Sequence, residues 1–420
     1  MILAHRIALD PTVKQRIAFA KACGVARFTY NWALAEWKRQ YEAGEKPTAF
    51  KLQKQWNSIK EKEFPWVYDS PKDANQRVFT DLGTSFKRFF SKTACYPVFK
   101  KKHHRERFYL TNTVVSVRGK RVTLGRIGTV RLREPLRFSG KIMSATISRE
   151  ADRWFISISV ETEVEKLPVV DKAVGIDLGI KTAVVLSDGT EFKAPAPLKV
   201  NLKKLRRLSK AHSRRVKGSN NRKKAAIKLA RLHSRIKNIR KDWTHKVTTK
   251  TVRENQTICL EDLNVKGMTA NRKLSRAISD IGFYEIRRQI EYKSLMYGRT
   301  VKIINRWLPT SKTCSNCGCK KAFLALSERA FHCTECGFSL DRDLNAARNI
   351  LAAGIAVTAC GPEGSGFCSN TETKPLGVET GTTPYVSTKV ACTPTRGLHI
   401  DPPCTSVSVT PVLLKTYPDT

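Results

Sequence analysis

Four cysteines in two close pairs are the feature that most constrains how this chain can fold. Each pair has C-x2-C spacing, and 15 residues separate the two pairs. The pairs are Cys314 with Cys317 and Cys333 with Cys336. Two thiolate pairs on tight turns suit one tetrahedral Zn²⁺ ion, and the short hairpin between them is stable only with that help. We therefore predict a structural zinc knuckle over residues 311–337, with Cys319 and His332 as less simple substitute ligands.

A helix is predicted directly after the second cysteine pair, in the stretch DRDLNAARNI. Asp341 is well placed to cap this helix. Spacing of i, i+3, i+4 and i+7 puts Asp343 on one face with Ala346, Ala347 and Ile350. That face is expected to pack, which leaves Asp343 at the upper end of the buried side and Asn345 on the side of Asp341.

Two more acids interrupt apolar segments: Asp177 in AVGIDLGI and Glu261 in TICLEDL. An isolated buried carboxylate is costly, so it usually reaches solvent, pairs with a base or binds a cation. Together with Asp343, these acids would supply oxygen ligands for two Mg²⁺ ions within one α/β domain. Two such ions activate a water molecule and stabilise the departing oxygen of a phosphodiester.

The net charge of +41 indicates a polyanionic partner. Nucleic acid is the favoured partner, because many phosphate contacts suit such an excess of Lys and Arg. An anionic membrane surface is the lesser alternative, since no basic segment carries an obvious aromatic and leucine face. Residues 203–241 hold 17 Lys and Arg and no acid, which predicts a basic helical hairpin that contacts nucleic-acid backbone. The predicted contact residues are Lys203, Lys204, Arg206, Arg207, Arg214, Arg215, Arg222, Lys223, Lys224, Arg231 and Arg235.

The remaining sequence predicts a multidomain protein of α/β and β parts. Alternating segments predict a small, barrel-like β domain, and the segments before it are mainly helical, with a break near Gly24. Mixed strands and helices follow as an α/β domain interrupted by the basic hairpin. The predicted segments are 1–9 and 106–168 for the β domain, 10–105 for the helices, 169–355 for the α/β domain and 356–420 for a tail.

The tail is rich in Ser, Thr, Pro and Gly, a composition that predicts a mobile segment. We expect it to be dispensable for activity. Nothing near Met1 resembles an export signal, and no run reaches the roughly 18 apolar residues that span a bilayer. The chain is therefore expected to be cytoplasmic and to have no membrane partner.

Five motifs, taken in order, resemble the TnpB proteins of bacterial and archaeal transposons, which are related to compact type V CRISPR effectors. The motifs are GIDLGIKTAVVLSDG, GSNNRKKAAIKLARLHSRIKNIRKDW, LEDLNVKGM, TSKTCSNCG with FHCTECG, and DRDLNAARNI. Each motif alone has low specificity, whereas the ordered set is highly specific. The similarity spans residues 1 to about 355, and it is weak before residue 170 and strong after it.

The resemblance implies an RNase H-like (RuvC) nuclease domain that is split by the zinc element. It implies that Asp177, Glu261 and Asp343 are the catalytic acids, and that the β domain is a wedge domain holding a helical recognition lobe. It also implies a guide RNA, a short motif beside the double-stranded target DNA, cleavage of DNA paired to the guide, and association with the nucleoid. Leu340 stands where the family often has His, but all three acids are present.

Two other functions are compatible with parts of the sequence. A guide-RNA and DNA-binding regulator or transposition accessory protein would share the motifs without cleaving, although the intact acids favour a nuclease. The segment GIDLGI also suits a phosphate-binding turn of actin-like ATPases and sugar kinases. Those enzymes need neither a zinc knuckle nor a large positive charge.

Overall fold

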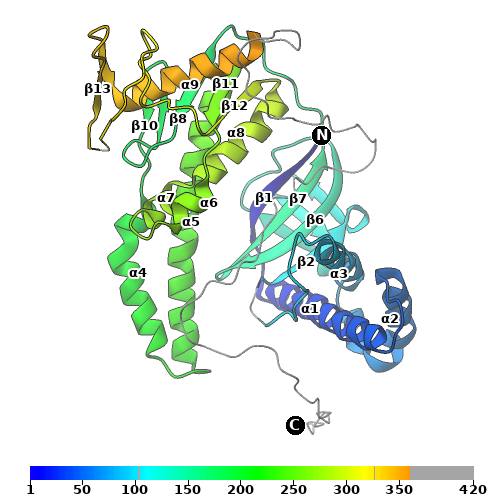
Figure 1. The fold of residues 1–420 in the computed structure, drawn as a ribbon. Helices are drawn as coiled ribbons and strands as arrows, with labels where there is room; N and C mark the ends of the chain where they lie inside the picture. The colour runs from blue at the N-terminus through cyan, green and yellow to red at the C-terminus, as the bar shows by residue number, and fades with distance from the viewer. Residues whose placement is uncertain (103–104, 326, 360–420) are drawn as a thin grey trace.

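The computed structural model describes residues 1–102, 105–325 and 327–359, which form two lobes (Figure 1). The N-terminal lobe holds an antiparallel sheet with strand order β2-β6-β7-β1-β5-β4-β3. Its strands are β1 (Ile2–Asp10), β2 (Arg107–Thr111), β3 (Val115–Arg118), β4 (Arg121–Leu124), β5 (Thr129–Leu132), β6 (Lys141–Glu150) and β7 (Arg153–Glu161). The predicted β domain is therefore present as a sheet, whereas its closure into a barrel stays a prediction.

Helices α1 (Val13–Glu42) and α3 (Asp73–Phe90) pack against β2 of this sheet, and α2 (Ala49–Glu63) packs on these two helices. Thr12 starts α1 with a capping box, because its side chain accepts from the Gln15 amide while the Gln15 side chain accepts from the Thr12 amide. The predicted break at Gly24 is wrong, since α1 continues through it. Burial of Cys23 and Val25 on either side outweighs the roughly 1 kcal/mol that glycine costs a helix.

The C-terminal lobe is built on a five-stranded sheet with order β10-β9-β8-β11-β12. Strands β8, β11 and β12 are parallel, and β9 is antiparallel to β8. The strands are β8 (Ala173–Asp177), β9 (Val184–Leu186), β10 (Glu191–Phe192), β11 (Thr257–Glu261) and β12 (Thr300–Ile304). Strands β8, β9 and β11 are buried along most of their length, as their apolar sequences predict.

Helices surround this sheet, and two of them form the predicted basic hairpin. The helices are α4 (Pro197–Ser213), α5 (Asn220–Glu254), α6 (Val265–Ala270), α7 (Ser275–Ile281), α8 (Phe283–Tyr297) and α9 (Arg342–Ala359). Helices α4 and α5 run side by side away from the sheet (Figure 1). Helix α9 extends beyond residue 356, where the tail was predicted to begin. Residues 360–420 of that predicted tail lie outside the described residues.

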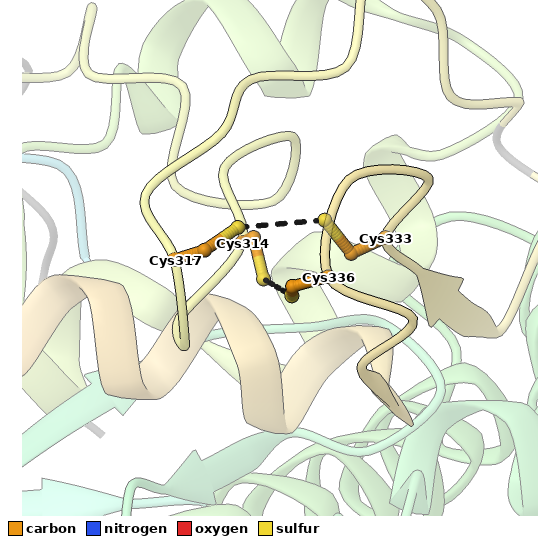
Figure 2. Close-up of side chains that lie close together, drawn as sticks. All are labelled: Cys314, Cys317, Cys333 and Cys336. Carbon is orange, nitrogen blue, oxygen red and sulfur yellow. Dashed lines mark hydrogen bonds between the residues drawn. The ribbon is translucent and has the colours of Figure 1, made fainter.

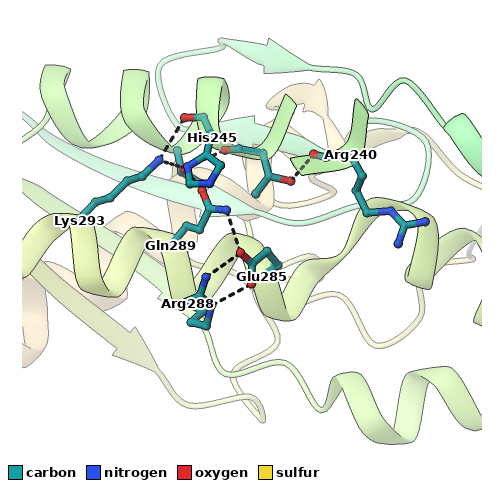
Figure 3. A network of polar contacts seen from close by, with 8 residues as sticks. Arg240, His245, Glu285, Arg288, Gln289 and Lys293 are labelled. Carbon is teal, nitrogen blue, oxygen red and sulfur yellow. Dashed lines mark hydrogen bonds and ion pairs between the residues drawn. The ribbon is translucent and has the colours of Figure 1, made fainter. Parts of the chain in front are cut away.

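Buried polar groups join α5 to α8 (Figure 3). The Nζ atom of Lys293 donates to the His245 carbonyl at 3.1 Å and to the Thr248 and Thr249 hydroxyls at 2.7 and 2.8 Å. Burial lowers the pKa of Lys293 to about 8. Burial and the neighbouring Lys293 charge lower the pKa of His245 to about 4. The packing of α8 on α5 therefore favours a neutral imidazole at position 245.

None of the described helices is long and apolar enough to cross a membrane.

His245 should make folding stability depend on pH between about 6.5 and 4. The unfolded chain binds this proton near pH 6.5, whereas the folded chain binds it only near pH 4, so the free energy of unfolding should fall as the pH drops through this window. His245→Gln should flatten that fall, and His233→Gln, at an exposed position of α5, should leave it unchanged. Urea denaturation between pH 7 and 4.5 measures this, and equal slopes in wild type and His245→Gln would contradict the interpretation.

Candidate metal centre and acidic site

The four spaced cysteines lie together on two facing loops (Figure 2). The Cys317 and Cys333 sulfurs are 3.5 Å apart, and the Cys314 and Cys336 sulfurs are 3.8 Å apart. All four Sγ atoms lie within 4.8 Å of one another. Four sulfurs at roughly 2.3 Å from a tetrahedral zinc ion are separated by about 3.8 Å, so the arrangement fits one Zn²⁺ ion. The predicted set of four cysteines is confirmed as the cluster, and neither Cys319 nor His332 belongs to it.

Tight backbone turns place each cysteine pair. The Cys314 amide donates to the Cys319 carbonyl at 2.8 Å, and the Cys333 amide donates to the Phe338 carbonyl at 2.8 Å. Gly318 and Gly337 directly follow the second cysteine of each pair and have φ of +77° and +67°. This left-handed conformation favours glycine because other residues carry a strained Cβ there. The C-x2-C-G sequence therefore encodes the turn that aims both sulfurs of a pair the same way.

The lowered pKa of the Cys336 thiol also suits a metal ligand. The Phe338 amide and the Asn316 side chain donate toward its sulfur and lower the pKa of Cys336 to about 6. Its partner Cys317 keeps a proton in the metal-free cluster, because hydrogen bonding to the other three cysteines raises the pKa of Cys317 to about 12. Thiolate is the form that binds metal, so zinc would release that proton when it binds.

The three predicted acids come from three elements of the C-terminal lobe. Strands β8 and β11 are parallel and pair Ile176 with Leu260, so Asp177 and Glu261 end neighbouring strands at the same edge. Asp343 lies in the first turn of α9, and one of its carboxylate oxygens is 4.0 Å from the position that a Cβ on Gly179 would occupy. Gly179 follows β8 closely, so Asp343 reaches the segment that carries Asp177.

The acids affect one another's ionisation. Burial, then the charges of Asp343 and Glu261, raise the pKa of Asp177 to about 7. Burial also raises the pKa of Glu261 and of Asp343, helped by Asp262 and Asp341 respectively. Carboxylates whose ionised forms are disfavoured in this way gain from a divalent cation, which is the chemistry of a magnesium site. Within the described residues, however, only the cysteines form a ligand group as tight as 4.8 Å.

Close backbone packing sets the position of α9 over β8. A Cβ at Gly175 of β8 would lie 2.1 Å from the Ala347 carbonyl oxygen and 2.6 Å from the Leu351 nitrogen. Only glycine therefore allows this approach. The predicted packing face of α9 is confirmed, since Ala346, Ala347 and Ile350 are buried. Asp341 caps the helix as predicted, and its Oδ1 atom accepts from the Asp343 and Leu344 amides at 2.9 and 3.1 Å.

Two asparagines of α9, neither of them predicted from the sequence as a site residue, connect the helix to the cysteine loop. Asn345 was placed on the side of Asp341, yet it is fully buried. Its Nδ2 atom donates to the Thr313 carbonyl at 2.7 Å, and its Oδ1 atom accepts from the Ser315 amide at 2.9 Å. Asn349 Nδ2 donates to the same Thr313 carbonyl at 2.6 Å. The helix that carries Asp343 is therefore fixed directly to the residues beside Cys314, and two asparagines at i, i+4 spacing were the available signal.

The basic hairpin exposes most of the predicted contact residues, with exceptions. Arg231 forms a bidentate ion pair with Asp152 of the N-terminal lobe, at 2.6 and 3.0 Å, so it joins the lobes and is not free for phosphate. Arg222 is half-buried, and its guanidinium donates to the Arg215 carbonyl at 2.7 Å. The other predicted contact residues are exposed: Lys203, Lys204, Arg206, Arg207, Arg214, Arg215, Lys223, Lys224 and Arg235.

Three family models match parts of the chain. "Probable transposase" of the OrfB_IS605 type matches residues 157–272, the "Cas12f1-like, TNB domain" matches residues 283–350, and an OrfB_IS605 "Helix-turn-helix domain" matches residues 1–46. Within 1–46 the structure has one strand and one continuous helix.

Curated relatives match nearly the whole chain. A protein of Streptomyces pristinaespiralis named "Putative RNA-guided DNA endonuclease" is 37% identical over 367 residues, covering 85% of this chain and 90% of the relative. InsQ of Escherichia coli K12, named in the same words, is 37% identical over 381 residues, covering 85% and 94%.

The fold resembles that of a solved structure. The Cas12f1 chain of a cryo-EM complex with sgRNA and target DNA has a TM-score of 0.52 at 15% identity, covering 80% of this chain and 82% of that one.

Removing the Asp177 charge should stabilise the metal-free protein. At pH 8 this carboxylate is ionised although burial, and then the charges of Asp343 and Glu261, disfavour that form, so Asp177→Asn should raise the melting temperature by roughly 2–4 °C for each kcal/mol of that cost relieved. Asp177 takes up a proton near pH 7 in the folded protein, so its contribution to the free energy of unfolding should rise as the pH falls through 7, and the stability difference between variant and wild type should shrink there.

Asp188→Asn is the matched control, because it removes an ion pair of 2.9 Å with Lys172 and should not raise the melting temperature. Differential scanning calorimetry in the presence of a chelator measures the melting temperatures of the wild type and of both variants. A melting temperature for Asp177→Asn at or below that of wild type at pH 8 would contradict the electrostatic interpretation of the acidic site.

Proposed function

Because the chain belongs to the TnpB (OrfB) family of RNA-guided DNA endonucleases, we propose that it cleaves DNA phosphodiesters at Asp177, Glu261 and Asp343 after a bound guide RNA pairs with the target. The observation that carries this proposal is the acidic edge of the five-stranded sheet. Two strand ends and one helix start supply its three carboxylates, and burial, then the charges of the other two, raise the pKa of Asp177. An acidic site of this kind in a chain of net charge +41 suits a reaction in which cations and phosphate are bound together.

Each carboxylate has a role in the proposed reaction. Burial, then the charges of Asp343 and Glu261, raise the pKa of Asp177 to about 7, so its ionised form would gain from a bound cation. Glu261 and Asp343 would complete the set of carboxylate ligands. Two Mg²⁺ ions held by these residues would supply a water of lowered pKa and stabilise the charge on the departing oxygen.

The cysteine cluster is proposed to hold one structural Zn²⁺ ion. Four sulfur ligands leave no vacant position for substrate, so this ion takes no part in the chemistry. Its contribution is to fix the loop that Asn345 and Asn349 hold. Through those two side chains the cluster positions α9, and with it Asp343.

The remaining parts of the chain are proposed to hold nucleic acid. The exposed Lys and Arg of the α4–α5 hairpin would contact the backbone of the guide RNA or of its duplex with DNA. The seven-stranded sheet and helices α1–α3 are proposed as the wedge domain and the recognition lobe, which read the short motif beside the target. Base pairing with the guide then carries the choice of sequence.

A non-cleaving regulator or transposition accessory protein is the alternative function. The substitution of Leu340 for the common His is the feature that favours it. Leu340 pairs with Phe331 in the two-stranded sheet of β13 (Ala330–His332) and β14 (Ser339–Asp341), and Asp343 keeps its place at the start of α9. The structure therefore gives no physical reason for Leu340 to disable the acids.

Asp177→Ala should abolish Mg²⁺-dependent DNA cleavage, with a loss of at least 1,000-fold, while guide-RNA binding stays within about twofold of wild type. The assay uses the purified complex of protein and guide RNA, a double-stranded target and an electrophoretic measurement of RNA binding. Asp188→Ala is the surface control and should cleave normally. Persistent cleavage by Asp177→Ala would overturn the assignment of the site.

Replacing both Cys333 and Cys336 by Ser should release the zinc ion and lower cleavage more than nucleic-acid binding, because Asp343 loses its support. Metal analysis by mass spectrometry reports the zinc content, and the same cleavage assay reports the activity. Cys259→Ser, outside the cluster, is the control for loss of a thiol and should keep its zinc. Wild-type protein free of zinc would contradict the metal assignment.

A further inference from the structure

Trp307 is the most exposed tryptophan of the chain. Its exposed fraction is 84%, whereas that of Trp66 is 44% and the other tryptophans are buried or partly buried. An indole leaves more apolar area in water than almost any other side chain, so such exposure suits a ligand that covers the ring. Neither the metal sites nor the basic hairpin uses Trp307.

The exposed indole stands on an ordered turn. The Trp307 amide donates to the Asn305 Oδ1 atom at 3.0 Å, and the Leu308 amide donates to the Asn305 carbonyl at 3.2 Å. The Thr310 amide in turn donates to the Leu308 carbonyl at 2.8 Å. These hydrogen bonds fix the backbone on both sides of the ring, so little conformational entropy is lost when a ligand stacks on it.

Both ends of the turn are anchored to elements that carry the acids. Arg306 pairs with Asp262, which follows Glu261, and Asp262 also pairs with Arg287 of α8. At the other end, Asn349 of α9 donates to the Thr310 carbonyl at 2.7 Å. The turn therefore runs from the end of β12, the neighbour of β11, to the helix that begins beside Asp343.

These anchors limit the distance between Trp307 and the acids. Ile304 pairs with Glu261 across the parallel strands, and Trp307 follows Ile304 by three residues. A strand spacing of ~4.8 Å and a reach of ~3.6 Å per residue put the Trp307 Cα within about 16 Å of the Glu261 Cα. This span corresponds to a few nucleotides.

We propose that Trp307 stacks on an unpaired base of the DNA strand whose phosphodiester lies at Asp177, Glu261 and Asp343. In a duplex the faces of a base are covered by its neighbours, so an indole gains full stacking only on an unpaired base. Arg329, Arg342 and Lys181 act electrostatically on Asp343, so cations for the adjoining phosphates are at hand. The inference rests on the proposed function and adds a single-strand binding subsite to it.

The test uses the full-length protein with its guide RNA and the Asp177→Asn substitution, so that no DNA is cut. The probe is a set of target strands that each carry 2-aminopurine at one position near the cleavage site, because stacking on an indole quenches this fluorescent base. One or two adjacent positions should be quenched. Trp307→Ala should remove that quenching and weaken binding of the single strand roughly 5- to 150-fold, whereas Trp307→Phe should retain most of the binding.

Three controls keep the result specific to this ring. Phe50→Ala, at a side chain that is 77% exposed in α2, should leave the quenching unchanged. The melting temperature of Trp307→Ala should match that of its parent, since the indole buries little area. An abasic nucleotide at the quenched position should weaken binding to the parent but not further weaken binding to Trp307→Ala.

Three outcomes would overturn the inference. The 2-aminopurine fluorescence could stay quenched in Trp307→Ala, or the guide RNA could quench it without the protein. The third is self-association of the protein that Trp307→Ala abolishes, which would make a second copy of the chain the partner of the indole. Stacking and cleavage are measured separately, so the proposals can fail independently. Trp307-dependent quenching with no cleavage by wild type would sink the proposed function and leave a base-stacking site at Trp307. Normal cleavage by Trp307→Ala together with unchanged quenching would sink this inference only.

Discussion

The close packing of α9 on β8 is the contact on which the rest of the C-terminal lobe depends. Because Gly175 has no side chain, the backbone of α9 lies against the strand and its first turn reaches the strand's end. On its other side the same helix holds the cysteine loop through Asn345 and Asn349. One helix thus joins the cysteine cluster to the acidic edge, which explains why cysteines and aspartates follow one another so closely in the sequence.

A second constraint is the conflict of charge between the acidic site and the body that holds it. The acids destabilise one another when ionised, and the surrounding chain carries a large positive excess. Neither the group of acids nor the positive excess favours folding by itself, since like charges repel. Both become favourable when cations bind to the acids and phosphates bind to the basic surface. The proposed active site would in this way trade stability for function.

Local spacing made part of this structure predictable. The cysteine pairs, the alternating strands and the acids inside apolar runs each specify an environment within a few residues, so the cluster, the sheets and the helix cap were recognised from the sequence. The predictions that differ from the structure concern residues whose environment is set by tertiary contacts. Gly24 stays helical because its neighbours are buried, Asn345 is buried because the cysteine loop folds over it, and Arg231 is paired because Asp152 of the other lobe meets it. A shared site for Asp177, Glu261 and Asp343 was predicted from their common domain and stays a proposal, which the parallel register of β8 and β11 supports for Asp177 and Glu261.

The measurement that tests the central claim most directly is the location of divalent metal in crystals of the protein soaked with Mn²⁺. Anomalous diffraction distinguishes Mn²⁺ from the lighter atoms around it and also locates zinc. The account predicts manganese between the carboxylates of Asp177, Glu261 and Asp343, and zinc among the four cysteines. Manganese bound elsewhere, with these carboxylates left without a cation at saturating Mn²⁺, would contradict it.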